Sequence, residues 1–208
     1  NVGQKLLTRL PDGTQVYLNS NSNISYSSDF SEHAREIILT GEAFFDVFHD
    51  DRPFVVHANG MKTEVLGTAF NVKNRAGEDA EVTLVKGTVR VKTSGDKSLI
   101  LQPNQQVVIS TASGEMVARE VNVLRYTSWK DNTLFFERTT LREAIREIEM
   151  WYAVDIDIEN PALGSCVITA KYQNEPLGNV LSSFQFLLNL QITKKNEGRY
   201  SINGQACK

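Results

Sequence analysis

The sequence predicts an all-β domain over residues 1–124, followed by a small α+β domain over residues 125–204. Three observations predict this division. From about residue 6 to residue 123, apolar residues alternate in short runs broken by Gly, Asn, Asp and Pro, as in half-buried strands. After residue 123 the apolar spacing becomes that of amphipathic helices. The second part also contains an internal repeat, and residues 205–208 form a tail.

Composition narrows the class of protein. The 208 residues are 41% hydrophobic and 23% charged, which is ordinary globular usage. The formal net charge is −3, whereas domains that bind nucleic acid usually carry a basic face, so we do not expect nucleic acid as a partner. No apolar run reaches the length of about 18 residues that a membrane span needs. Cys166 and Cys207 are too few for a disulfide scaffold, so we expect free thiols, with a bridge between them as the alternative.

The β domain is predicted to begin with a hairpin. Its turn lies at Leu10-Pro11-Asp12-Gly13-Thr14, where Asp-Gly favours a type I′ turn and places Leu7 opposite Leu18 on one core face. Further strands are predicted at 24–26, 35–39, 43–48, 54–57, 63–66, 69–73, 81–85, 88–92, 99–101, 106–110 and 116–121. Sharp corners are expected at the glycines that join apolar segments, Gly41, Gly67 and Gly87. Alternation does not show which strands pair, so a β-solenoid, a sandwich and a jelly roll all fit.

The second domain is predicted to be a tandem β-α-β repeat. Thr140 and Glu143 have the spacing of a capping box, so a helix begins at Leu141. An offset of 36 residues takes Leu141 to Leu177 and keeps apolar residues aligned through strand, helix and strand. A last strand is predicted at 199–202.

The sequence contains no recognisable catalytic, metal-binding or cofactor-binding motif. His33, His49 and His57 lack the spacing that places two imidazoles on one metal, and no phosphate-binding or nucleophile motif is present. Carboxylates near residues 46–51 and 155–159 are interpreted as solvated polar faces. We therefore expect no enzyme, no cofactor and no small-molecule substrate.

Protein binding is the function with physical support, because a small sheet has edges whose backbone groups can accept a partner's strand. The segments 168–173, 190–194 and 199–202 are predicted edges. Their candidate partner-binding residues are Ile168, Lys171, Tyr172, Leu190, Ile192, Lys194, Tyr200 and Ile202. In the alternative interpretation, the lysines of these edges, Lys171, Lys194 and Lys195, only guard against aggregation.

Several motifs occur in the order found in one family. They include Leu10-Pro11-Asp12-Gly13, Gly41-Glu42-Ala43-Phe44-Phe45, Gly67-Thr68-Ala69-Phe70 and Gly87. In the order of these motifs, the chain resembles the FecR-type anti-sigma regulators. Residues 129–202 resemble the C-terminal domain of the Bacteroidetes-type members. That domain is in turn similar to the short secretin and TonB N-terminal module. The motif residues themselves are interpreted as structural, since a glycine corner followed by aromatic core residues explains them.

The resemblance implies a function in signalling across an envelope. It implies that the chain is the periplasmic region of a single-pass inner-membrane protein, with its membrane segment and sigma-binding cytoplasmic segment outside this sequence. It also implies that this region receives a signal from the signalling domain of a TonB-dependent outer-membrane transporter and controls an extracytoplasmic-function sigma factor. An envelope carbohydrate-binding or structural module is the alternative.

Overall fold

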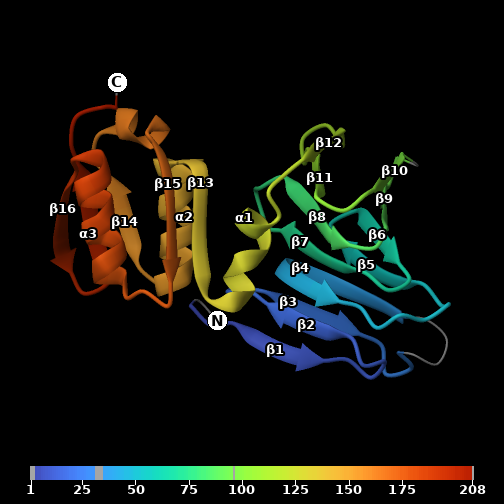
Figure 1. The fold of residues 1–208 in the computed structure, drawn as a ribbon. Coiled ribbons are helices and arrows are strands. Elements are labelled where there is room, and N and C mark those ends of the chain that lie inside the picture. The colour runs from blue at the N-terminus through green and yellow to red at the C-terminus, as the bar shows by residue number, and fades with distance from the viewer. Residues whose placement is uncertain (1–2, 31–34, 96, 208) are drawn as a thin grey trace. The chain divides into compact units, whose positions relative to one another are not determined.

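The structure, a computed structural model, describes residues 3–30, 35–95 and 97–207. The chain divides into two compact units: Lys5–Lys130 form one, and the described residues of Asn1–Gln4 and Asp131–Lys208 form the other. The chain therefore passes between the units twice, once after Gln4 and once after Lys130. Figure 1 follows the chain through both.

The first unit is almost entirely β, which confirms the all-β prediction. Its described strands are β1 (Leu6–Arg9), β2 (Gln15–Leu18), β3 (Asn23–Tyr26), β4 (Arg35–Asp46), β5 (Phe54–Ala58), β6 (Met61–Val65), β7 (Ala69–Asn74), β8 (Ala80–Lys86), β9 (Val89–Thr93), β10 (Ser98–Leu101), β11 (Gln105–Ile109) and β12 (Met116–Glu120). Two helical turns follow, α1 (Leu124–Thr127) and η1 (Ser128–Asp131).

One long strand, β4, organises this sheet. Its first half pairs with β3 and, in parallel, with β5, whereas its second half pairs with β2 and β7. The main path of the sheet runs β10-β9-β6-β5-β4-β7-β8-β11-β12. The sequence pattern predicts two strands separated by a corner at Gly41, whereas the structure has one strand with Gly41 inside it at φ +93°. A Cβ there would lie 2.8 Å from the carbonyl oxygen of Asn21, so only glycine fits.

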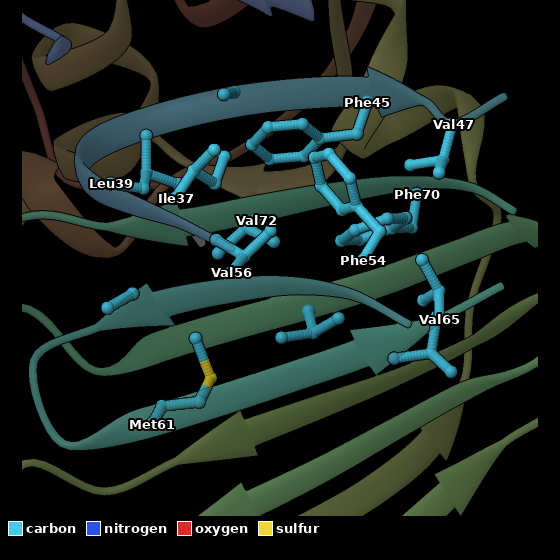
Figure 2. Packing of buried hydrophobic residues seen from close by; sticks show 14 of the residues in the cluster. Ile37, Leu39, Phe45, Val47, Phe54, Val56, Met61, Val65, Phe70 and Val72 are labelled. Atoms are coloured by element: carbon cyan, nitrogen blue, oxygen red, sulfur yellow. The ribbon is translucent and has the colours of Figure 1, made fainter. Parts of the chain in front are cut away.

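Both halves of the sheet contribute to one core, as the close-up in Figure 2 shows. Phe45 of β4 stacks on Phe70 of β7 at 5.2 Å between ring centroids, and lies 5.9 Å from Phe54 of β5. All three rings are fully buried. The folded-over sheet is thus sandwich-like, with inward apolar residues from both layers.

The first hairpin differs from its prediction. Gly13 N–H donates to the Leu10 carbonyl, so Pro11 and Asp12 are the central residues of the turn, and Gly13 follows with φ +90°. Because the turn contains three residues rather than two, the register shifts by one. Leu7 pairs with Tyr17, not with Leu18, and its side chain is 55% exposed.

The second unit is α+β, as predicted. Its elements are β13 (Thr133–Thr140), α2 (Leu141–Tyr152), β14 (Asp155–Ile158), η2 (Pro161–Ser165), β15 (Val167–Gln173), α3 (Leu177–Leu188), β16 (Gln191–Asn196) and β17 (Arg199–Asn203). β13 pairs with β15, while β14, β17 and β16 form a three-stranded sheet in that order. Both helices contact strands of both sheets.

The sequence signals for the two helices are confirmed. The Thr140 hydroxyl accepts the Glu143 N–H at 3.3 Å, and the Glu143 carboxylate accepts the Thr140 N–H at 3.2 Å, which completes the capping box. Leu141, Ile145 and Ile148 face the core as expected. The equivalent residue at the start of α3, Pro176, makes no side-chain cap bond.

The expectation of free thiols is wrong. Cys166, which precedes β15, forms a disulfide with Cys207, and their Cα atoms lie 5.4 Å apart. The tail is brought back to this position after β17, where the Asn160 side-chain amide donates to the Gly204 carbonyl at 3.0 Å. Position near a chain end suggested mobility, but this contact holds the tail against η2.

Candidate protein-binding surface

Sheet order decides which strands of the second unit can accept a partner. Among the described residues, β16 has a strand partner only on the side of β17, and β15 only on the side of β13. Each therefore keeps one free edge, as predicted for 168–173 and 190–194. The prediction that 199–202 is an edge is wrong, because β17 lies between β14 and β16 and is paired on both sides.

Burial sorts the predicted partner-binding residues into two groups. Ile168, Leu190 and Ile202 are buried core residues, and Tyr172, Ile192 and Tyr200 are partly buried against the same core. Only Lys171 and Lys194 are exposed. The predicted apolar side chains thus contribute to the core. The groups that β15 and β16 leave for a partner are the backbone of their free edges and the exposed side chains of the two strands.

An apolar patch beside β16 was missed by the sequence analysis. Phe186 is 88% exposed and Leu187 50% exposed, and both lie in the last turns of α3, which contacts β16. The 36-residue repeat placed Leu187 on the buried stripe. A signal was present: Phe184, Phe186, Leu187 and Leu188 are more apolar residues than one helix stripe can bury.

Charges around the β16 edge are mainly basic. Lys194 is exposed, and Lys195 Nζ lies 3.2 Å from Glu159 Oε1 at the surface. Hydrogen bonds from Ser201 and Lys195 hold the pKa of the Glu159 carboxyl below its usual range. The free edge, the apolar patch of Phe186 and Leu187, and these lysines together form the candidate surface.

The family-motif residues of the first unit have structural partners. Arg35 is fully buried, and its Nη1 lies 3.1 Å from Asp12 Oδ2 in the hairpin turn. Thr68, after Gly67, donates to the Thr88 carbonyl beside Gly87, which ties two corners together. Phe45 and Phe70 belong to the core. Glu42 and Phe44 are buried on the opposite face of the sheet from that core.

The described histidines do not form a metal site. His57 Nε2 lies 3.2 Å from Glu36 Oε2 on the surface, and His33 lies outside the described residues. Across the part of the chain that the structure describes, no group of three or more His, Cys, Asp or Glu side chains could hold a metal ion. None of the described helices is long and apolar enough to cross a membrane.

A hollow of about 650 Å³ lies on the first unit, over β3, β4 and the β5–β6 hairpin. Its lining includes Tyr26, Glu36, Ile38, His57 and Lys62. Tyr26 is 45% exposed and Ile38 59% exposed, so the hollow offers an aromatic ring and an aliphatic side chain beside charged groups.

Comparison with known proteins covers both units. The family model described as FecR protein matches residues 1–90, and the one described as FecR, C-terminal matches residues 133–202. Two crystal structures, at 1.65 and 2.50 Å resolution, both described as an anti-sigma factor from Parabacteroides distasonis, are similar to this chain with TM-scores of 0.88 and 0.87. They are 28% and 29% identical to it over 99% of this chain and 97% of theirs. No curated protein matches the chain.

Proposed function

Because this chain belongs to the FecR-type family of anti-sigma factors, we propose that it is the periplasmic sensor region of a transmembrane anti-sigma factor. In this proposal it receives a signal from the signalling domain of a TonB-dependent outer-membrane transporter and controls an extracytoplasmic-function sigma factor through a segment outside this sequence. It carries out no chemistry. The similarity to anti-sigma factor structures over nearly the whole chain is the observation that carries the proposal.

Two structural features support this assignment. The Cys166–Cys207 disulfide suits an oxidising compartment such as the periplasm. The free edge of β16, next to the exposed Phe186 and Leu187, offers backbone groups and an apolar anchor for a partner's strand. We assign partner binding to this surface.

The test is a binding titration of the whole chain against the periplasmic signalling domain of the TonB-dependent transporter encoded beside it. Saturable binding is expected, and Phe186→Asp should weaken it about tenfold or more, because a charge replaces an exposed apolar anchor. The matched control is Ile38→Asp, which places the same charge at an exposed apolar position of the first unit and should leave the affinity unchanged. No binding by the unaltered chain contradicts the proposed partner, and equal losses in both variants contradict the assigned surface.

An envelope carbohydrate-binding module is the second candidate, and the hollow over β3–β6 is the observation that favours it. An exposed Tyr26 ring beside Glu36, His57 and Lys62 provides a stacking face and hydrogen-bonding groups suited to a sugar. Binding on a glycan array that Tyr26→Ala abolishes would support this function. If no glycan on the array binds, the carbohydrate-binding function is ruled out.

A further inference from the structure

The first unit has a row of six outward-facing residues, four of which are buried although they point away from the core. Strand pairing aligns them directly across six neighbouring strands, β2, β4, β7, β8, β11 and β12. The row consists of Tyr17, Phe44, Asn71, Thr83, Gln106 and Arg119. Each alternates with inward-facing neighbours, such as Phe45 beside Phe44, so the row lies on the opposite face. Phe44, Asn71, Thr83 and Gln106 are nevertheless at most 6% exposed.

The segment that follows β12 runs along this row. Near its start, Arg119 Nη2 lies 3.5 Å from the Tyr126 hydroxyl. Further along, the Trp129 indole N–H donates to Asn71 Oδ1 at 3.2 Å. At its end, Lys130 Nζ lies 5.6 Å from the Tyr17 ring centroid and 5.3 Å from that of Phe44. Residues 122–130 thus meet the strands in spatial order from β12 to β2.

The anchor of Trp129 continues into a buried polar network. Asn71 Nδ2 donates to Glu42 Oε1 at 3.0 Å, and Glu42 Oε2 also accepts from Arg75 Nη2 at 2.6 Å and from Asn19 Nδ2 at 2.9 Å. Asn71 is 3% exposed, so removal of the Trp129 indole takes a donor from a buried carbonyl oxygen. In the Gly41–Phe45 motif, Phe44 therefore faces Lys130 of this segment, and Glu42 holds the Asn71 side chain that accepts the Trp129 N–H.

We propose that residues 122–130 form a releasable strap that is latched onto this row by Trp129 and Lys130. Only Thr127 and Trp129 are buried within it, and its helix α1 is four residues long, too short to be stable away from the sheet. Release would expose the buried members of this row, which are Phe44, Asn71, Thr83 and Gln106. It would also add about 30 Å of extended chain to one of the two connections between the units. The strap lies outside the residues that either family model matches.

Limited trypsin digestion of the full chain tests the strap, because Arg125 and Lys130 are cleavage sites within it. The unaltered chain should resist cleavage at both. Trp129→Ala should accelerate cleavage at Arg125 about tenfold or more, since cleavage follows the population of the open form. Trp129→Phe keeps a ring without the N–H and should be intermediate. The control is Leu124→Ala, which removes a 55% exposed side chain from α1, the helix that contains Arg125. This variant should be cut as slowly as the unaltered chain.

Fluorescence provides a second measurement that does not require the Trp129→Ala protein to fold. Trp151→Phe leaves Trp129 as the only tryptophan of the 208-residue chain. Its emission should be that of a buried indole, with little quenching by iodide, and Asn71→Ala should increase the quenching severalfold. The proposal is overturned if the unaltered chain is cut at Arg125 as fast as an unfolded peptide, if Trp129→Ala and Leu124→Ala are cut equally slowly, or if Trp129 is freely quenched before any substitution.

Discussion

At the scale of single residues, the first unit depends on a buried guanidinium. Arg35 has no exposed surface, and in addition to Asp12 it donates to the carbonyls of Phe48 at 2.8 Å, Leu66 at 3.1 Å and Arg52. Five donors in a planar fork allow one side chain to join the first turn, the start of β4 and two later loops. A lysine could not replace Arg35, because its single ammonium group lacks this planar set of donors.

Loss of Arg35 should therefore be costly. Arg35→Met removes the buried cation beside the Asp12 carboxylate and the guanidinium donors to three carbonyl oxygens. We expect the unfolding free energy of the first unit to fall by about 3–5 kcal/mol. Arg90→Met is the control, because Arg90 Nη1 lies 3.9 Å from Glu64 in an exposed pair that is worth about 1 kcal/mol or less. Urea unfolding followed by circular dichroism compares the two. A similar small loss in both variants would contradict the structural role of Arg35.

Two tyrosines make the second unit sensitive to alkaline pH. Burial raises the pKa of the Tyr152 phenol, helped by the nearby negative charge of Glu175, and burial likewise raises the pKa of Tyr172. The Tyr152 hydroxyl donates to the Glu175 carbonyl at 2.6 Å, a bond that a phenolate cannot make. Between the unfolded pKa of about 10 and the higher folded values, the unfolded chain binds fewer protons, so stability falls as the pH rises.

We predict that the melting temperature of the second unit declines above about pH 10. At lower pH both phenols are protonated in the folded and the unfolded state, so they add no pH dependence. A Tyr152→Phe and Tyr172→Phe double variant should show a shallower decline between about pH 9 and pH 11. Thermal unfolding across that range measures both slopes, and lysine deprotonation affects the two proteins alike. Identical slopes would mean that neither phenol differs between the folded and unfolded states.

At the scale of elements, the two β-α-β repeats share a register but differ in how they are held. α2 begins with a complete capping box and ends at Ala153 in the left-handed region, φ +56°. α3 begins after Pro176 without a side-chain cap. The second repeat is instead closed by the disulfide, which joins the residue before β15 to the tail after β17. The bridge therefore encloses β15, α3, β16 and β17 in one covalent loop.

Reduction should weaken this second repeat. Opening the Cys166–Cys207 loop enlarges the unfolded ensemble, and we expect the second unit to lose about 2–4 kcal/mol of unfolding free energy. Urea unfolding with and without a reductant measures the loss. A Cys166→Ala and Cys207→Ala variant is the control, because it should start from the lower stability and be insensitive to the reductant. A reductant effect of the same size in that variant would contradict the assignment.

At the scale of the whole molecule, the chain holds two separate hydrophobic cores. One contains the aromatic cluster around Phe45, and the other gathers α2, α3 and both small sheets around residues such as Ile148 and Phe184. Two cores of this kind are expected to unfold separately.

Leu181→Asp tests this independence. Leu181 is 5% exposed within the second core, so a buried carboxylate there should unfold the second unit while the β signal of the first unit and its melting transition persist. Ser182→Asp adds the same charge at the neighbouring exposed position of α3 and should leave both transitions in place. Calorimetry resolves the transitions. Loss of both units in a single cooperative melt would rule out two independently stable domains.

Much of the candidate surface could be anticipated, but not its details. The free edges of β15 and β16 followed from the predicted strands, whereas β17 could not be placed from its own residues, since its position between β14 and β16 depends on pairing with distant segments. The exposure of Phe186 depended on how much of α3 the two sheets cover. A sequence period indicates which face of an element is apolar, not how wide the covering layer is.

The sequence by itself determined what is local: the alternation of the β strands, the capping box of Thr140 and Glu143, and the 36-residue register. These features depend on residues within a few positions of one another. Only the tertiary structure decided the continuation of β4 through Gly41, the Cys166–Cys207 bridge and the row beneath Trp129. Each of these joins segments far apart in the chain. Alternation fixes which face a side chain occupies, but the strand, tail or strap that covers that face is selected by packing across the whole fold.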